Sequence, residues 1–156
     1  MPCSRKLAVS GERFSSSDFS SVADELSVEI PEKLLHADVL GAGPGWSSFS
    51  GLRRHFVRVV DLPSRLLSVT IGGLKPGESS RRHRHNYETI IYVLEGRGTS
   101  EIGPRTVQWK AGDALYIPTW AWHAHTNGSA TEPAMYLACE NAPMLQNLGI
   151  ALRQES

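Results

Sequence analysis

Short runs of β-branched and aromatic residues, separated by turn residues, fill most of the chain after Gly51. These runs are RHFVRVV at 54–60, RLLSVTIGGL at 65–74, TIIYVLEG at 89–96, GTSEI at 98–102, TVQW at 106–109, DALYIP at 113–118 and PAMYLACE at 133–140. β-branched and aromatic residues favour strands, and the turn segments GLKPGE, EGRG, EIGPR and KAGD reverse the chain about every ten residues. The pattern predicts an all-β sandwich or barrel rather than a fold of alternating strands and helices.

The two ends of the chain read differently from this central part. Residues 1–21 are rich in serine and charge, like a linker, and GAGPGWSSFSG at 41–51 is typical of a loop. Between Ser21 and Leu40 the apolar residues have mixed helical spacing, and Pro31 is suited to begin a helical turn. We therefore expect residues 1–50 to form a partly helical or irregular N-terminal extension and residues 51–156 to form the barrel. APMLQNLGIALRQE at 142–155 is expected to be a short helix or a covering tail.

Composition excludes several classes of partner. A chain of 156 residues, 40% of them hydrophobic, supports one domain with a core, and 16 basic against 16 acidic residues give no net charge. Nucleic acid and anionic membranes are therefore not expected partners. Cys3 and Cys139 do not make a disulfide framework or a thiolate metal site, which favours a reducing compartment. Without an apolar run of membrane-spanning length, we expect a soluble, cytoplasmic protein.

Four histidines in two His-x-His pairs carry the candidate chemistry. Residues i and i+2 of a strand face the same side, so His83 and His85 can bind one metal ion, as can His123 with His125. The first pair also lies among arginines, which fits a solvated basic surface equally well. The second pair makes the metal site the better interpretation, because a second His-x-His in one small β domain is an improbable coincidence.

These histidines lie in two motifs that resemble those of the cupin family. The first motif is carried by Gly77, His83, His85 and Gly96, and the second by Gly112, Pro118, His123 and Asn127. The resemblance implies an antiparallel jelly-roll β-barrel with one metal at its mouth, bound by His83, His85 and His123.

One element of the cupin pattern is absent. The first motif usually places Glu or Gln where this chain has Thr89 or Ile90, and Glu88 comes one residue too early. A slip of one residue along a strand turns a side chain to the opposite face. We therefore expect Thr89 to face the metal and Glu88 to point away, unless a local irregularity brings Glu88 to the metal.

The three-histidine pattern resembles the gentisate and 1-hydroxy-2-naphthoate 1,2-dioxygenases more than cupins in general. The matching segments are HRH at 83–85, WAWHAHTN at 120–127 and TEP at 131–133. Those enzymes are normally longer chains with two cupin domains. The resemblance implies one divalent metal, first of all Fe(II), with Zn, Ni or Mn also compatible, and cleavage of a small aromatic or dioxygenated acid. In this interpretation His125 is the candidate catalytic residue, as an acid or base near the substrate or as a group that supports the ligands; a histidine held by a hydrogen bond at the rim fits its position equally well.

Residues of the substrate pocket are harder to predict. Tyr87, Glu88, Trp120 and Trp122 are the candidates, although aromatic residues at a barrel mouth more often serve packing. Arg65, Arg81 and Arg82 could bind a carboxylate, but most arginines are simply solvated. Two alternatives to a dioxygenase remain open: a non-catalytic cupin that binds metal and a small ligand, and a metal-dependent isomerase or lyase. Because a barrel of this size leaves edges and an apolar outer face, we also expect a homodimer.

Overall fold

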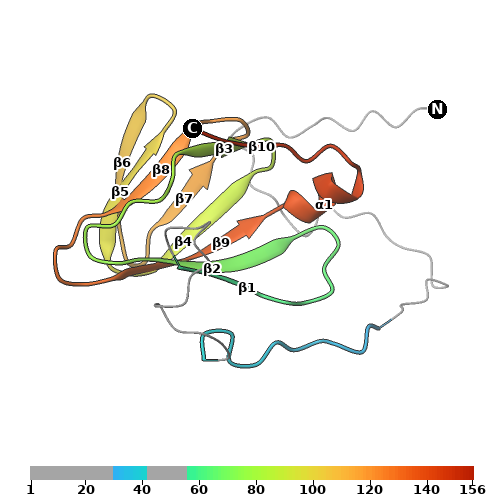
Figure 1. Cartoon of the computed structure of the whole chain (residues 1–156). Coiled ribbons are helices and arrows are strands. Elements are labelled where there is room, and N and C mark those ends of the chain that lie inside the picture. Colours follow the sequence, from blue (N-terminus) through green and yellow to red (C-terminus); the bar gives the residue numbers. More distant parts are fainter. Residues whose placement is uncertain (1–29, 42–55) are drawn as a thin grey trace, which may run out of the picture. The chain divides into compact units, whose positions relative to one another are not determined.

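The computed structural model describes residues 30–41 and 56–156, and this part of the chain forms two five-stranded antiparallel sheets (Figure 1). The first sheet has the order β1 (Phe56–Val59), β2 (Ser68–Leu74), β9 (Ala134–Glu140), β4 (Thr89–Glu95) and β7 (Ala114–Ile117). The second has the order β10 (Arg153–Glu155), β3 (His83–His85), β8 (His123–Asn127), β5 (Arg97–Ile102) and β6 (Arg105–Lys110). The all-β antiparallel fold expected from the sequence is confirmed.

Alternation along the strands explains how the sheets enclose a core. In β4 the side chains of Thr89, Ile91 and Val93 are buried while those between them are exposed, and in β9 buried residues alternate with half-buried ones. Apolar side chains from both sheets meet inside; they are Leu74, Ile91, Val93, Trp109, Leu115, Ile117, Ala134, Tyr136 and Ala138. The period-two pattern that predicted strands thus also determines which residues reach the interior.

Two glycines allow the chain to pass from one sheet to the other. Gly96, between β4 and β5, has φ of 82°, and Gly112, between β6 and β7, has φ of 92°. Side chains rarely adopt this left-handed region. A Cβ on Gly96 would also lie only 2.7 Å from the carbonyl oxygen of Pro133, so both the backbone angle and the close approach require glycine there.

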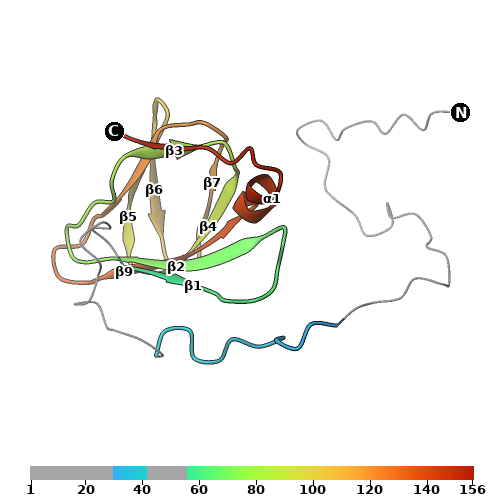
Figure 2. The ribbon, with the colours of Figure 1, turned by 45° about the vertical axis from the view of Figure 1, so that its right-hand side comes forward.

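The two ends of the described chain can be compared with the expectations for a partly helical or irregular extension and for a short helix or covering tail. Of the helical stretch expected between Ser21 and Leu40, residues 30–40 are described, and they contain a turn beginning at residue 37 but no helix; residues 21–29 lie outside the described ranges. At the other end, a short helix α1 (Ala142–Asn147) is followed by β10, which pairs with β3 at one end of the barrel (Figure 2). Within the described ranges, no helix combines the length and apolar character needed to cross a membrane.

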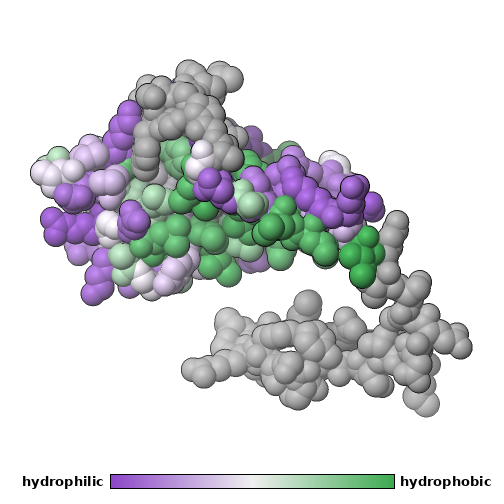
Figure 3. Space-filling model, turned by 90° about the horizontal axis from the view of Figure 1, so that it is seen from below, coloured by the Kyte–Doolittle hydropathy of each residue, from purple (hydrophilic) through white to green (hydrophobic). Residues whose placement is uncertain are grey.

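The outer face of the first sheet is apolar. Ile90, Tyr92, Leu94 and Tyr116 point outward from β4 and β7 and are between 38% and 57% exposed. Figure 3 shows apolar side chains (green) gathered across the face of the molecule that is seen from below. Contiguous exposed apolar surface is typical of contact with another protein surface. The homodimer expected from the sequence remains a prediction.

Asn127 joins the end of β2 to the turn that follows β8, at the base of the barrel. Its side chain is 2% exposed, and its amide nitrogen donates to the carbonyl oxygens of Leu74, Lys75 and Glu132 at 3.2, 3.1 and 2.8 Å. Its side-chain oxygen accepts from the backbone N–H of Ser129 at 2.9 Å. The asparagine of the second motif therefore has a structural role, because it satisfies backbone groups that the sheets leave unpaired.

Asn127→Asp should destabilise the fold by roughly 3–5 kcal/mol, because it places a buried carboxylate against three carbonyl oxygens with no positive partner. Urea unfolding followed by circular dichroism measures this change. Asn147→Asp is the matched control, since the exposed Asn147 donates to one carbonyl oxygen, that of Arg65. Its effect should stay below about 1 kcal/mol. Equal losses in the two variants would contradict the structural role of Asn127.

Candidate metal centre and pocket

Three histidines from two neighbouring strands converge at the mouth of the barrel. His83 and His85 lie on β3, and His123 lies on β8 directly opposite His83 in the antiparallel register. One nitrogen from each ring lies within 4.8 Å of the other two, and the Nε2 atoms of His83 and His123 are 3.1 Å apart. The spacing of two residues on β3 and the pairing of β3 with β8 are sufficient to bring these three side chains together.

Hydrogen bonds at the back of each ring determine where its proton lies. Nδ1 of His83, His85 and His123 lies 2.9, 2.8 and 2.9 Å from the carbonyl oxygens of Arg81, Tyr87 and Ala121, respectively. A carbonyl oxygen only accepts, so each Nδ1 carries the hydrogen and donates it. Each Nε2 is then left with its lone pair, which is the arrangement that a metal ligand requires.

The short contact between His83 and His123 therefore joins two acceptor atoms. Two lone pairs 3.1 Å apart repel each other unless a positive charge lies between them. Burial lowers the pKa of His83 to about 3 and that of His85 to about 4, and it also lowers the pKa of His123. A proton is accordingly a poor candidate for this positive charge at neutral pH, whereas a divalent metal ion fits the donor set.

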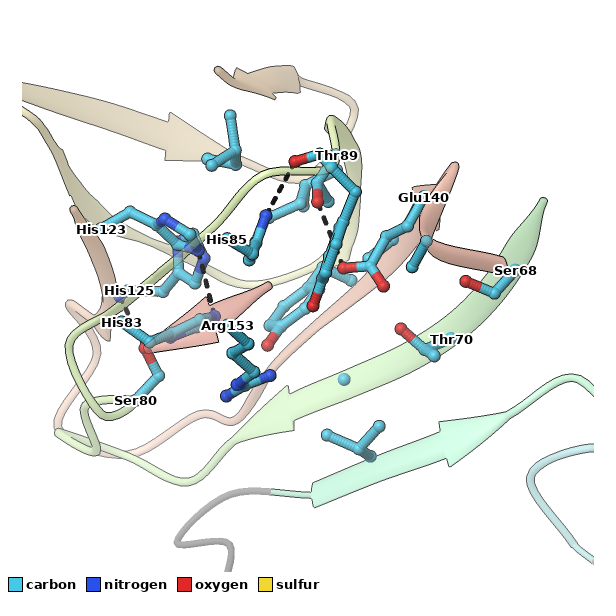
Figure 4. Close-up of a pocket in the computed structure, with 18 of the residues that line it drawn as sticks. Ser68, Thr70, Ser80, His83, His85, Thr89, His123, His125, Glu140 and Arg153 are labelled. Carbon is cyan, nitrogen blue, oxygen red and sulfur yellow. Dashed lines mark hydrogen bonds between the residues drawn. The ribbon is translucent and has the colours of Figure 1, made fainter. Parts of the chain in front are cut away.

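The three histidines line a cavity of about 390 Å³ between the two sheets (Figure 4). This volume is in the range of small-molecule sites, which is about 300–1,000 Å³. Ile91, Ile117 and Ala138 contribute apolar surface from the first sheet. Hydroxyl groups also line it, from Ser68, Thr70, Ser80 and Thr89.

His125 lines the same cavity but lies beside the three-histidine group. Its ring centroid is 5.7 Å from that of His123, and its Nδ1 lies 2.7 Å from Oγ of Ser100. Trp109 Nε1 donates to the same oxygen at 2.9 Å, so Trp109, Ser100 and His125 form a buried hydrogen-bonded chain.

The expected difference between Thr89 and Glu88 agrees with the geometry. Thr89 is 3% exposed and lines the cavity, while Glu88 is exposed and accepts a hydrogen bond from the hydroxyl of Tyr116. Tyr87 also lines the cavity, with its ring stacked on His85 at a centroid distance of 3.9 Å. The carboxylate usual in cupins is thus replaced here by a hydroxyl group.

Trp120 and Trp122 do not line this cavity, contrary to expectation, and neither does Glu88. The guanidinium of Arg84 lies over both tryptophan rings, at 4.5 Å from Trp120 and 4.7 Å from Trp122, and Arg82 lies 4.8 Å from the ring of Trp122. Arginine stacking on an aromatic face is favourable, and these rings pack under arginines of β3 and the preceding loop. We therefore assign the two tryptophans to packing around the mouth.

Several charged residues of the cavity were not predicted from the sequence. Arg153 and Glu155 reach it from β10, and Glu140 reaches it from β9; Arg81, one of the three arginines considered above, also lines it. The sequence offers one signal for the first two, the spacing of two residues in RQE at 153–155. That signal is too short to identify a strand without knowledge of its partner.

Comparison with known proteins supports the assignment of the fold. Residues 71–139 match the family described as the cupin domain. The chain is 35% identical over 115 residues to a 5-aminosalicylate 1,2-dioxygenase of Comamonas sp; the aligned region covers 72% of this chain and 30% of that protein. The chain is also 36% identical over 87 residues to gentisate 1,2 dioxygenase 1 of Aquipseudomonas alcaligenes, and this aligned region covers 53% of this chain and 24% of that protein.

Among solved structures, the salicylate 1,2-dioxygenase of Pseudaminobacter salicylatoxidans superposes with a TM-score of 0.61 at 23% identity, over 68% of this chain and 32% of that chain. This likeness concerns the fold. The chain spans less than a third of the length of each of these three proteins. The family match, the relatives and the two antiparallel sheets agree with the resemblance seen in the motifs. Residues 71–139 are therefore a cupin domain, and the barrel resembles the cupin domains of gentisate 1,2-dioxygenases.

Proposed function

We propose that this cupin is a mononuclear metal-dependent dioxygenase that uses Fe(II) to cleave the ring of a small aromatic acid. The observation that carries the proposal is the convergence of three Nε2 lone pairs, each set by a hydrogen bond from Nδ1 to a backbone carbonyl. The names of the relatives, which include 5-aminosalicylate and gentisate 1,2-dioxygenases, support the reaction class and the substrate class.

His83, His85 and His123 would hold the metal. Fe(II) held there by three neutral imidazoles would supply the activation of dioxygen toward an oxygen-bearing substrate. Zn, Ni and Mn also bind imidazole, so the ligand set alone does not select iron. Because Thr89 replaces a carboxylate ligand, the three protein ligands themselves carry no negative charge; the carboxylate of Glu140, which accepts a hydrogen bond from Thr89 at 3.2 Å, lies in the same cavity. An anionic substrate would add negative charge next to the metal.

His125 would act on the substrate rather than on the metal. The hydrogen-bonded chain of Trp109, Ser100 and His125 holds the imidazole at the cavity wall, and with the Ser100 hydroxyl donating to Nδ1 the imidazole proton would lie on Nε2. A proton held there can be donated to a substrate oxygen as charge develops on it. The ring of Tyr87, stacked on His85, and the buried walls of the cavity help to exclude water from this exchange.

Protein purified without added metal or chelator should contain close to one equivalent of iron, measured by inductively coupled plasma mass spectrometry. His83→Ala and His123→Ala should each lose it, because two imidazoles do not retain the ion. His36→Ala is the control, since Nδ1 of His36 accepts from the backbone N–H of Asp61 and the residue does not line the cavity. Iron that persists in both site variants would exclude this ligand set, and zinc or nickel in its place would favour a binding protein or an isomerase.

The Fe(II)-loaded protein should consume dioxygen with salicylate, 5-aminosalicylate or gentisate, and mass spectrometry with labelled dioxygen should find both oxygen atoms in the ring-opened product. His125→Gln should keep its iron but lose about 10²- to 10⁴-fold in turnover, the usual range for a general acid or base. Turnover of the same compounds under nitrogen would instead indicate an isomerase or lyase. Binding without any turnover would indicate a non-catalytic cupin.

The metal-free protein should lose stability as the pH falls below about 6.5. Burial lowers the pKa of His83 to about 3 and of His85 to about 4, so between about pH 6.5 and 4 the unfolded chain binds more protons than the folded chain. The free energy of unfolding then decreases by up to about 1.4 kcal/mol per pH unit for each histidine. Urea unfolding of the metal-free protein across this range measures the slope. His85→Gln should flatten it, whereas Thr70→Val, a cavity variant without a titrating group, should not.

A further inference from the structure

Arg153 is directed at the three-histidine centre by strand register. Its Cα pairs with that of His85 across β10 and β3, and Glu155 pairs in the same way with His83. Residues that pair directly in an antiparallel ladder have side chains on the same face. Because His85 and His83 point into the cavity, Arg153 and Glu155 do so as well, and both line it.

The residue between them shows the opposite orientation. Gln154 pairs with Arg84, and its side-chain oxygen accepts two hydrogen bonds from that guanidinium, at 2.9 and 2.6 Å. Arg84 in turn lies over the tryptophan rings at the mouth and not in the cavity. Because side chains alternate along both strands, Arg153 of β10 points into the cavity, whereas Arg84 of β3 points away from it.

β10 is anchored to the barrel by more than its own ladder. The side chain of Asn86 donates to the carbonyl oxygen of Ile150 at 2.7 Å and accepts from the backbone N–H of Leu152 at 2.8 Å. The backbone N–H of Ser156 donates to the carbonyl oxygen of Arg82 at 3.2 Å. Arg153 is thus positioned by hydrogen-bonded structure on both sides of it.

The charges around Arg153 leave a positive excess at this end of the cavity. Glu155 lies 2.9 Å from the guanidinium of Arg153 and 3.3 Å from that of Arg81, so a single carboxylate serves two cations. Glu140, the other carboxylate that lines the cavity, lies on the far side from His83, whereas Arg153 lies beside His83 (Figure 4).

A guanidinium next to a site for a divalent cation is unfavourable unless an anion lies between them. We propose that Arg153 binds the carboxylate of the substrate, and that the cavity thereby selects aromatic monocarboxylates over their neutral analogues. This inference rests on the proposed function, which supplies the metal and the substrate class. The planar guanidinium suits a carboxylate because it can donate two parallel hydrogen bonds to it. The carboxylate would then neutralise Arg153 on one side and the metal on the other.

The inference is tested by calorimetric titration of the iron-loaded, full-length protein under nitrogen, at about pH 7, with salicylate and with its neutral amide, salicylamide. These ligands differ in one charged group and keep the ring and the hydroxyl. The wild type should bind salicylate more tightly than salicylamide. Arg153→Gln should weaken the affinity for salicylate about ten- to hundredfold, which is the range for a hydrogen bond between charged groups. The affinity for salicylamide should not change.

Two further variants separate binding from folding. Arg153→Lys keeps the charge but not the paired donors, and it should recover part of the affinity for salicylate. Arg105→Gln on β6 removes an exposed arginine outside the cavity and should change neither affinity. Equal weakening of both ligands by Arg153→Gln, or no weakening of salicylate, would overturn the inference. So would a wild type that binds the two ligands equally or binds neither.

Failure of the proposed function would look different. A protein that binds salicylate through Arg153 but consumes no dioxygen would retain the inference and lose the dioxygenase assignment. Conversely, dioxygen consumption with unchanged salicylate affinity in Arg153→Gln would keep the enzyme and remove the role of Arg153. Circular dichroism of each variant confirms that the barrel is intact before titration.

Discussion

The hydrogen bonds from Nδ1 of three histidines to backbone carbonyls are the constraint on which the site depends. Each bond both orients its ring and assigns the proton, so three lone pairs face one point. The carbonyl acceptors lie within two residues of their histidines, on Arg81, Tyr87 and Ala121, so the backbone path around each strand end determines the tautomer. The pairing of β3 with β8 then sets the distance between the histidines of the two strands. A site built this way needs no side-chain partner behind the ligands, which differs from the common carboxylate–histidine arrangement.

Local sequence rules predicted the parts of the site that depend on strand alternation. The pairs His83 with His85 and His123 with His125 face inward as expected, and Thr89 faces the cavity while Glu88 does not. The same rules did not predict β10. It pairs with residues about seventy positions away, and its own alternating pattern is only three residues long, which is too short to identify a strand. The sequence did not predict the orientation of Trp120 and Trp122 for a related reason. That orientation depends on Arg82 and Arg84, which stack on the rings from other segments of the chain.

The two sheets contribute different groups to the cavity. The second sheet provides the nitrogen ligands and the arginine, whereas the first sheet provides the apolar wall, with Ile91, Ile117 and Ala138, and the hydroxyl groups of Ser68 and Thr70. The first sheet also brings Thr89 and Glu140 to the cavity, so a ring lying between the sheets would meet apolar and polar groups on that side. The nitrogen ligands and Arg153 lie on the other side, which is consistent with a substrate that carries its charge and a hydroxyl group next to each other on the ring.

The short edge strand that carries Arg153 links binding to local order. β10 has three exposed residues and pairs with β3 alone, so its backbone hydrogen bonds are more open to solvent than those of the central strands. Strands of this kind open and close many times during one global unfolding event. An occupied cavity would hold β10 closed through the side chain of Arg153, so ligand binding would slow amide hydrogen exchange at residues 153–155 before it altered exchange in the core strands. Ligand binding and the ordering of β10 would then be coupled. The measured affinity for the ligand would include the free energy needed to hold β10 in place.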